Sequence, residues 1–181
     1  LWKKFGGKTP HISYEIYGSV TGRLTTKSNS FPILNLKKDI ADIVKPTNDA
    51  FIQFDFNGAE VRTLLSLSGE TQPKEDIHEF NAKILKCTRE KAKKKFFAWF
   101  YNPNKKNIEL SEVYKRDKVL ERHYSDGIVQ TPFGRKIEAD DFHSFNYLLQ
   151  SSSSDNCLQQ AIKINKFLHG RRSFVHSVVH D

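Results

Sequence analysis

The sequence predicts an α+β fold, in which several helices pack on an antiparallel sheet. Segments with alternating apolar and polar residues, as in half-buried strands, occur near both ends of the chain and around residue 130. Between them lie longer segments whose apolar residues recur at helical spacing. The two kinds do not follow one another as regular βαβ units, so a parallel sheet is not expected. A chain of 181 residues can bury one core and carry a small lobe beside it.

Four segments are expected to form strands. The second alternates most clearly, with Ile52, Phe54 and Phe56 on its buried face, so Asp55 projects from the opposite face. The third has the pattern of a hairpin, because short apolar segments flank a turn-forming Thr-Pro-Phe-Gly sequence. The four segments are His11–Tyr17, Ala50–Phe56, Gly127–Ile137 and Ser173–Asp181.

Five segments have the apolar spacing of helices. The first is expected to open at Asn57 and to close at Gly69, because Asn and Gly are favoured at these caps. The last contains the serines 151–154, which alone would suit a linker, but apolar residues resume at helical spacing directly after them and favour one long helix. The five segments are Gly58–Ser68, Ile77–Leu85, Thr88–Tyr101, Glu109–Tyr124 and Asp140–His169.

The positive charge of the chain is concentrated in one segment. The net charge is +8, and residues 83–106 contain nine Lys or Arg side chains against a single acid, Glu90. The aromatic residues 96, 97 and 99–101 are interleaved with these cations. Such a segment suits nucleotides or nucleic acid, whose phosphates are negative and whose bases stack on flat rings. Taken alone, it fits the solvated face of a lysine-rich helix better.

Several classes of protein are not expected. No apolar run approaches the roughly 20 residues of a membrane span, and the first residues lack the apolar region of a signal peptide, so an intracellular setting is the default expectation. Cys87 and Cys157 are far apart and outside any metal-ligand spacing, which favours neither a disulfide framework nor a zinc module. The lack of Met and the apolar run at the end favour a fragment of a longer protein.

Asp55 and Asp181 form the first candidate site, because each stands at or near the end of a predicted strand and off its apolar face. Two such carboxylates can hold two Mg²⁺ ions, which activate an attacking hydroxyl and stabilise a leaving pyrophosphate. An aspartate at the end of a strand can also cap the next helix, and for Asp55 alone this alternative is favoured. The pair therefore needs support from elsewhere in the sequence.

The predicted helix Thr88–Tyr101 supplies a second candidate site. Four of its residues recur every fourth position, so on a helix they form one slowly drifting stripe about 18 Å long. These residues are Arg89, Lys93, Phe97 and Tyr101. The cations stand at the amino-terminal end, where the helix dipole also favours anions. A nucleoside triphosphate lying along the stripe would place its phosphates at the cations and its base at Phe97. In the alternative, Phe97 and Tyr101 belong to the core. This is less favoured, because a face that is buried in the core would not normally continue into charged residues on the same side of the helix.

Five short motifs follow one another along the chain. They are Thr21-Gly22-Arg23-Leu24, the segment from Phe54 to Arg62, Asp76-Ile77-His78, the stripe, and Val179-His180-Asp181. In this order and spacing they resemble the motifs of the DNA polymerase I family (family A DNA polymerases) and cover nearly the whole chain. Residues 131–135 and 146–150 also lie where that family has similar segments. Each motif alone is a weak indication, whereas chance agreement of all five is remote.

The resemblance implies a template-directed DNA polymerase, a nucleotidyltransferase that adds deoxyribonucleotides to a primer 3′ end in DNA replication or repair. Asp55 and Asp181 would then hold two Mg²⁺ ions, with the backbone carbonyl of Phe56 as a further ligand. The partners would be primer-template DNA and a dNTP.

The resemblance also implies roles for the residues around the nucleotide. Arg89, Lys93 and His78 would contact the triphosphate. Phe97 would pack against the base and sugar, and Tyr101 would guard the site that the templating base enters.

One acidic residue and four others complete the implied site. Glu60 would lie under the sugar and exclude a 2′-hydroxyl, although Asn57 and Glu60 also have the spacing of a capping box and both roles can coexist. Contacts to primer-template DNA near the primer terminus would read acceptors common to all correct pairs in the minor groove. The residues implied for these contacts are Arg23, Asn146, Gln150 and His180.

The family's architecture implies three parts of the chain. Residues 1–70 would be the first part of a palm domain built on the antiparallel sheet, and residues 71–125 a small helical fingers lobe. Residues 126–181 would be the second part of the palm, cut off at the second catalytic aspartate. The segment between Tyr101 and Gly127 is shorter than in bacterial members, which suggests a viral (phage-like) or plasmid-borne enzyme.

Some family positions differ, and two alternatives remain open. The differences are Gly58 for a Gln, Phe96 for an Asn, Ala98 for a Gly and Asn102 for a Gly, and they concern nucleotide selection. The first alternative is a relative of single-subunit RNA polymerases, against which Glu60 and Phe97 argue. The second is a non-catalytic remnant that binds nucleic acid. The sequence does not identify a processivity partner, and no membrane association is expected.

Overall fold

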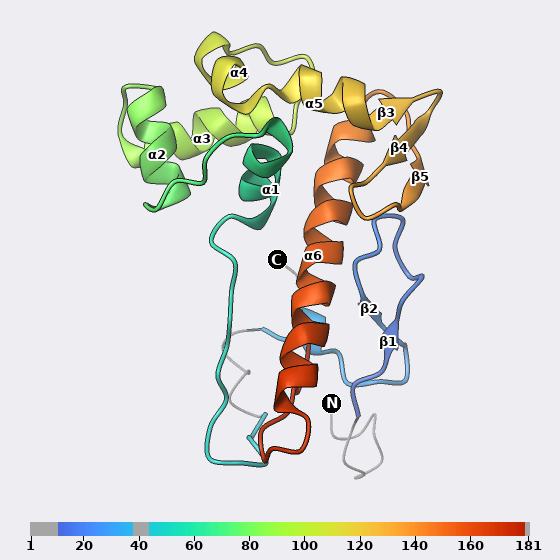
Figure 1. The fold of residues 1–181 in the computed structure, drawn as a ribbon. Coiled ribbons are helices and arrows are strands. Elements are labelled where there is room, and N and C mark those ends of the chain that lie inside the picture. Colours follow the sequence, from blue (N-terminus) through green and yellow to red (C-terminus); the bar gives the residue numbers. More distant parts are fainter. Residues whose placement is uncertain (1–10, 38–43, 180–181) are drawn as a thin grey trace. The chain divides into compact units, whose positions relative to one another are not determined.

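The computed structural model describes residues 11–37 and 44–179. They form an α+β structure of helices and two small antiparallel sheets (Figure 1), so the predicted fold class is confirmed at this level. The chain divides into two compact units. Asp55–Ser153 form one, here called the helical unit, and Leu1–Phe54 with Ser154–Asp181 form the other, the two-segment unit. The predicted division at residues 70 and 125 into palm and fingers stays a prediction.

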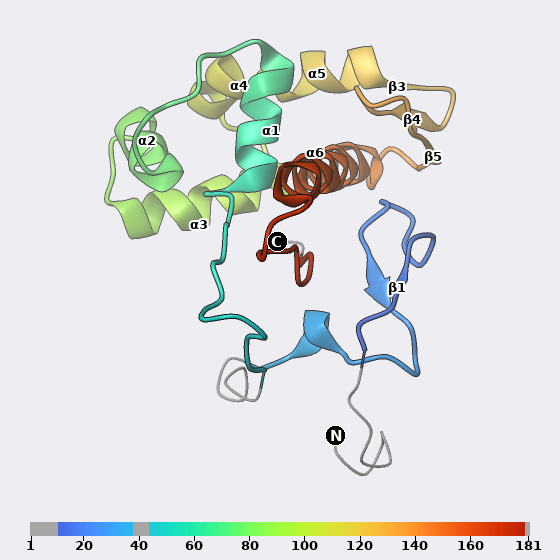
Figure 2. The ribbon, with the colours of Figure 1, turned by 60° about the horizontal axis from the view of Figure 1, so that its bottom comes forward.

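The helical unit is built mainly from short helices joined by tight turns. Its helices are α1 (Ala59–Ser68), α2 (Ile77–Ile84), α3 (Arg89–Phe100), α4 (Ile108–Tyr114) and α5 (Arg116–His123). The first three were predicted to within one or two residues at each end. They lie beside one another in both views (Figures 1 and 2).

One buried cluster of apolar side chains forms the core of the helical unit. The face of α3 that carries Phe96, Trp99 and Phe100 is its centre, and each of these side chains is at most 1% exposed. Helices α1, α2, α4, α5 and α6, together with β4 and β5, supply the other members. Burying several large aromatic rings in one place gives this unit its main source of stability.

Helix α1 begins in a different way from the one expected. Its N-cap is Gly58 in the left-handed region (φ 67°), and no side chain caps the helix, so the predicted opening at Asn57 is wrong. A Cβ at Gly58 would lie 2.8 Å from Cγ2 of Ile77, so the position needs glycine for both its φ and its space. The closing Gly69 is confirmed, with φ 77°.

The predicted single helix Glu109–Tyr124 is wrong, because the chain breaks it into α4 and α5. The break is at Lys115, which adopts the left-handed conformation (φ 48°) and forms an ion pair with Glu70. The next residue, Arg116, is buried and donates hydrogen bonds to four backbone carbonyls in and after α3 (Trp99, Asn102, Pro103 and Lys105, at 2.7–3.3 Å). The anchoring of Arg116 therefore takes precedence over helix continuity.

The hairpin expected at Gly127–Ile137 is present as part of a three-stranded sheet. The order is β3 (Tyr124–Ser125), β4 (Ile128–Gln130) and β5 (Lys136–Glu138), all antiparallel, with Val129 opposite Ile137. The first residue of β3, Tyr124, was predicted as the end of a helix, and Ser125 was in no predicted element, so the pairing of β3 with β4 is the new feature.

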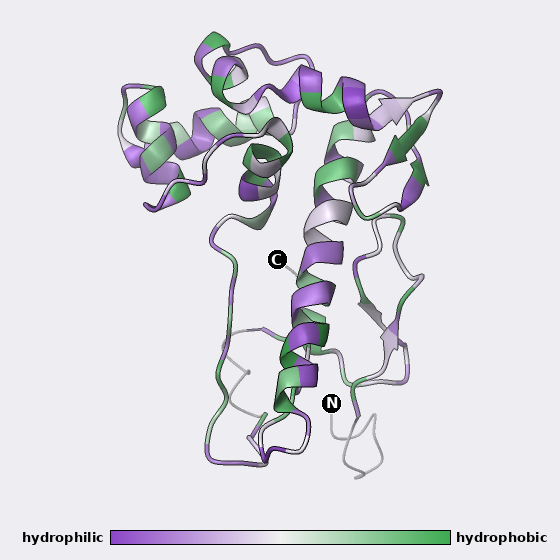
Figure 3. Ribbon diagram, viewed as in Figure 1, coloured by the Kyte–Doolittle hydropathy of each residue, from purple (hydrophilic) through white to green (hydrophobic). Residues whose placement is uncertain are grey.

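Helix α6 (Ser144–Leu168) runs through the four serines without a break, which confirms the long helix and excludes the linker. Hydrophobic colour marks its start, where Phe145, Leu148 and Leu149 are buried, gives way to hydrophilic colour along its middle and returns toward its end (Figure 3). Ser151, Ser152 and Ser154 are accommodated as small buried residues, and the half-buried Ser153 has its Oγ 3.0 Å from Thr63 Oγ1 of α1.

The two-segment unit contains much less regular structure. Strands β1 (Tyr14–Glu15) and β2 (Thr25–Thr26) form one antiparallel pair, and a 3-10 helix, η2, covers Ile33–Asn35. The first predicted strand is thus only two residues long within His11–Tyr17. The Ser154 hydroxyl donates to the Gly22 carbonyl (3.2 Å), which ties α6 to the loop before β2.

The strands expected at Ala50–Phe56 and in the described part of Ser173–Asp181 are not formed. The apolar face predicted for the first segment is open to solvent, with Ile52 and Phe54 each 79% exposed. A strand needs a neighbour for its backbone hydrogen bonds. The two segments are joined instead by a side-chain contact, in which the Phe51 and His176 rings are 4.9 Å apart. Just before both segments, Asn48 donates to the Arg172 carbonyl (2.7 Å).

The described residues contain no helix with both the length and the apolar character that a membrane crossing requires.

Candidate functional site

The four residues of the predicted stripe lie on α3 and at its end, as expected. Arg89, Lys93 and Phe97 belong to the helix, and Tyr101 is its C-cap. Lys93 is exposed, Arg89 and Phe97 are half-buried, and the Tyr101 side chain is 42% exposed. The stripe therefore follows the border between the core face of α3 and solvent, and we call it the α3 stripe.

The cationic end of the α3 stripe is attached to α2 through Asp76, the N-cap of that helix. Asp76 Oδ1 accepts from Arg89 Nε (3.1 Å), and Oδ2 accepts from Arg89 Nη2 (3.3 Å). The same Oδ1 accepts from the backbone N–H groups of His78 (3.0 Å) and Glu79 (3.1 Å). The hydrogen bond from Arg89 is the main reason why the pKa of Asp76 falls to about 2. The guanidinium is thus held along one edge.

His78 connects this cationic end to the aromatic end. Its ring meets the edge of Phe97 at 5.5 Å between centroids, with 62° between the planes. Its Nδ1 is buried and has no hydrogen-bond partner among the described residues. Burial is the main cause that lowers the pKa of His78, and the positive charges of Lys93 and Arg89 lower it further. One ring nitrogen of His78 is therefore left without a partner among the described residues.

The aromatic end of the α3 stripe is attached to α1. The rings of Phe97 and Tyr101 are stacked, with 5.7 Å between centroids and 8° between planes. The Tyr101 hydroxyl donates to Glu60 Oε2 (2.9 Å), which sets this carboxylate beside the rings. Phe97 also packs against the core cluster, so it contributes to both the core and the surface.

Arg62 of α1 fixes the loop between α1 and α2. Its Nε donates to the Asn57 carbonyl (2.8 Å), Nη1 to the Pro73 carbonyl (2.9 Å) and Nη2 to the Glu75 carbonyl (3.1 Å). One side chain thus joins the turn before α1 to the loop that leads into Asp76. The residues that frame the α3 stripe from α1 and α2 are held in place by this guanidinium.

The predicted metal ligands are only partly described. Asp55 and Phe56 are exposed and lie just before α1, and no strand carries them. Asp181 and His180 lie outside the described residues. The part of the chain that is described contains no group of three or more His, Cys, Asp or Glu residues placed to hold a metal. Asp55 is an oxygen ligand of the type that Mg²⁺ prefers, but a second ligand is not shown beside it.

The predicted DNA contacts are divided between the units. Arg23 is a half-buried residue of the two-segment unit, whereas Asn146 and Gln150 lie one turn apart on α6 in the helical unit. The Asn146 side-chain oxygen is buried and has no hydrogen-bond partner among the described residues. Their role in binding DNA stays a prediction.

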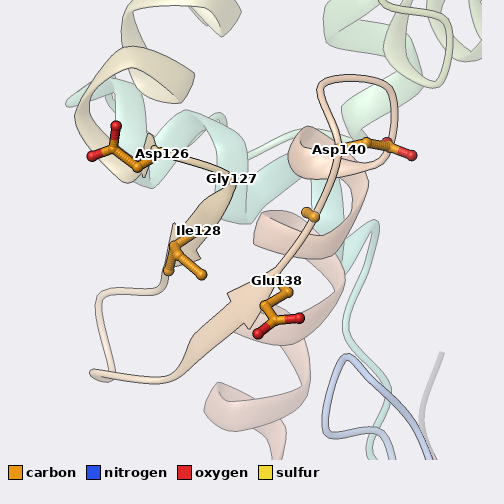
Figure 4. A pocket seen from close by; sticks show the side chains of 6 residues that line it. Asp126, Gly127, Ile128, Glu138 and Asp140 are labelled. Carbon is orange, nitrogen blue, oxygen red and sulfur yellow. The ribbon is translucent and has the colours of Figure 1, made fainter.

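A cavity of about 560 Å³ lies at the three-stranded sheet, lined by residues 126–128 and 138–140 (Figure 4). No sequence-predicted site residue lines it. The carboxylates of Asp126 and Asp140 point in opposite directions and do not converge with Glu138 (Figure 4). Asp140 is also engaged by the backbone N–H of His143 (2.7 Å). This cavity therefore has no convergent set of ligands.

Comparison with known protein families and with curated proteins found no match for this chain. Five of the predicted site residues form one continuous set. Glu60 contacts Tyr101, Tyr101 stacks on Phe97, and Phe97 meets His78, while Asp76 joins the amino-terminal end of α2 to Arg89.

The sequence prediction missed two residues that contribute to this set, Asp76 and Arg62. The Asp-x-x-Glu pattern of residues 76–79 could have shown Asp76 as a cap, whereas Arg62 binds backbone carbonyls, which no sequence pattern reveals.

Proposed function

We propose that the chain is the catalytic core of a template-directed DNA polymerase of the DNA polymerase I family, and that the α3 stripe binds the incoming dNTP. One observation carries the proposal. Residues far apart in sequence, which the family resemblance assigns to one nucleotide, lie in contact on the helical unit: Glu60 with Tyr101, and His78 with Phe97. The resemblance rests on motifs along the chain, and these contacts are independent of it.

The polarity of the α3 stripe supports a triphosphate as ligand. Arg89 and Lys93 stand in the first turns of a 12-residue helix, where backbone N–H groups and the helix dipole also attract anions. The stacked rings of Phe97 and Tyr101 at the other end offer an apolar surface for a base. A ligand with a charged end and a flat end fits this order of side chains.

Glu60 supports selection of the sugar. Its carboxylate is fixed by the Tyr101 hydroxyl at the aromatic end, where the sugar of a nucleotide would lie between phosphates and base. A carboxylate held in this way restricts the space next to the sugar and disfavours a 2′-hydroxyl. This favours a DNA polymerase over a relative that uses ribonucleotides.

The proposal assigns two Mg²⁺ ions to Asp55, the Phe56 carbonyl and Asp181, following the resemblance. When bound, such ions supply Lewis-acid stabilisation of the reacting phosphate. The residues of the chain bind and orient the triphosphate and balance its negative charge, with Lys93 as the exposed cation and Arg89 as the cation held by Asp76. Palm and fingers in this proposal correspond to residues 1–70 with 126–181 and to residues 71–125.

Equilibrium binding of dATP with Mg²⁺ to the whole chain tests the nucleotide site. The variant Lys93→Ala removes an exposed cation of the stripe and should weaken binding about tenfold, the size of one charge-assisted hydrogen bond. The matched control is Lys91→Ala, which removes an equally exposed lysine from a different face of the same helix and should change binding less than about twofold. Equal effects of the two variants would show charge attraction without a site.

Primer extension tests the chemistry. Asp55→Ala should abolish extension of a primed template, and Glu60→Ala should raise incorporation of ribonucleotides relative to deoxyribonucleotides. Extension that survives Asp55→Ala would refute the metal assignment. These measurements use the intact protein to which the chain belongs. Equal use of both sugars by that protein would favour the RNA polymerase alternative, and its binding of nucleotides without extension would favour the non-catalytic one.

A further inference from the structure

Asp76 makes more contacts than a helix cap requires. One oxygen, Oδ1, accepts from the two backbone N–H groups that open α2, which is the ordinary work of an N-cap. The other oxygen, Oδ2, accepts from Arg89 Nη2, and Oδ1 is shared with Arg89 Nε. The carboxylate and the guanidinium thus face each other along parallel edges, the geometry that fixes both the position and the plane of an arginine.

We propose that Asp76 is a positioning residue, which holds the Arg89 guanidinium so that its remaining N–H groups face the triphosphate on the α3 stripe. The inference rests on the proposed nucleotide-binding role of that stripe. The Nε–H group and one N–H of Nη2 are occupied by Asp76, and Nη1 donates to Glu90 Oε1 at 3.5 Å. Of the five N–H groups of the guanidinium, the second ones of Nη1 and Nη2 have no other acceptor among the described residues and can donate to phosphate oxygens.

An arginine without this partner would have to be ordered by the ligand itself. Arginine has several rotatable bonds, and fixing them at the moment of binding opposes binding. Asp76 fixes the rotatable bonds of Arg89 before the ligand binds. Because Asp76 also caps α2, it sets the position of Arg89, on α3, relative to His78, on α2. The two groups implied for the triphosphate are therefore positioned by one carboxylate.

The negative charge of Asp76 also has an opposing effect, because it repels a triphosphate. The side chains of Asp76 and Arg89 are 30% and 40% exposed, so solvent and salt weaken this repulsion. Salt screens the Asp76–Arg89 hydrogen bonds, at 3.1 and 3.3 Å, less than it screens a repulsion acting over a longer distance, so we expect positioning to dominate at physiological ionic strength.

Asparagine at position 76 separates the two roles of the residue. Asn is as good an N-cap as Asp, so Asp76→Asn keeps the N-cap of α2. The substitution removes the negative charge and one of the two oxygens that accept hydrogen bonds from Arg89. It should weaken binding of dATP with Mg²⁺ about fivefold, the cost of ordering one long side chain. The control Glu79→Gln removes a nearby acid, 3.9 Å from Arg89 Nε, that makes no hydrogen bond to the guanidinium, and should change binding less than about twofold.

The double variant decides whether the effect passes through Arg89. In an Arg89→Ala background, Asp76→Asn should not weaken dATP binding further, because it then removes only the repulsion between Asp76 and the triphosphate. The inference is overturned if Asp76→Asn leaves binding unchanged or tightens it, or if it weakens binding equally in both backgrounds.

A ligand-free readout keeps this inference separate from the proposed function. The Arg89 Nε–H group should give an NMR resonance that exchanges slowly with water in the unsubstituted chain and in Glu79→Gln, and rapidly in Asp76→Asn. If the chain binds no dATP, the proposed function fails, and this resonance alone decides whether Asp76 holds the guanidinium. Rapid exchange in the unsubstituted chain would overturn the inference.

Discussion

The helical unit and the two-segment unit differ in how their apolar residues are used. In the helical unit the apolar residues of each predicted helix meet in one cluster around α3, where Trp99 is 1% exposed. In the two-segment unit only Leu24 and Phe31 are buried among the described apolar residues, and Ile52 is 79% exposed although its segment alternates regularly.

The difference shows which sequence patterns are sufficient to predict an element of secondary structure without knowledge of its neighbours. A helix satisfies its backbone hydrogen bonds within its own segment, so an apolar stripe needs only some apolar neighbour to bury it. A strand depends on a partner of matching length and register for its hydrogen bonds. The alternating residues 50–56 have the pattern of a strand, but no paired neighbour among the described residues.

The largest expected effect comes from the core around α3. Trp99→Ala should lower the free energy of unfolding by about 3–5 kcal/mol, because it removes a buried ring that contacts Phe96, Tyr114 and the Arg116 guanidinium. Ile52→Ala should change it by less than about 0.5 kcal/mol, because the side chain lies in solvent. Urea unfolding followed by circular dichroism measures both. A loss above about 1.5 kcal/mol for Ile52→Ala would show that the predicted strand is packed after all.

A smaller effect is expected at the turn before α1. Gly58→Ala should cost about 2–4 kcal/mol, because alanine is strained at φ 67° and its Cβ would meet Ile77 Cγ2 at 2.8 Å. Gly69→Ala is the matched control, since Gly69 has φ 77° but nothing within 4 Å of an added Cβ, and should cost about 1–2 kcal/mol. Equal losses in thermal unfolding would mean that the contact with α2 has no part in the requirement for glycine.

The smallest effect concerns acid stability. Folding lowers the pKa of Asp76 from 3.8 to about 2, chiefly through the hydrogen bond from Arg89. The stabilisation is therefore complete above pH 3.8 and is lost as the pH falls from there toward 2. Since both side chains are partly exposed, it should not exceed about 1 kcal/mol. The stability difference between the unsubstituted chain and Asp76→Asn should shrink across this range, and a difference that is constant with pH would contradict the ion pair.

In the candidate site, too, contacts within one helix could be predicted from the sequence, whereas contacts between distant residues could not. The α3 stripe could be predicted because its four residues lie on one helix, where spacing alone determines the face. The pair Glu60–Tyr101 was implied only by the family resemblance, since 41 positions separate the two residues. Asp76 and Arg62 were missed as contributors, because Asp76 acts through a residue 13 positions away and Arg62 acts on backbone carbonyls.

Local reasoning also failed where a buried polar group overrides a regular pattern. Residues 109–124 are amphipathic throughout, yet the helix breaks at Lys115 so that Arg116 can reach the carbonyls at the end of α3. Four hydrogen bonds from one buried arginine to backbone carbonyls outweigh the loss of helical continuity. This break is also what fixes the loop after Tyr101, next to the aromatic end of the α3 stripe.

Titration of the isotope-labelled chain with dATP and Mg²⁺, followed residue by residue by NMR, tests the proposed site as a whole. We expect the largest chemical-shift changes at Arg89, Lys93, His78 and the Phe97 ring, with little change in α4, α5 and the three-stranded sheet. Changes confined to other elements, or none at a nucleotide concentration of several millimolar, which is on the order of the weakest binding expected of such a site, would contradict a nucleotide site on α3.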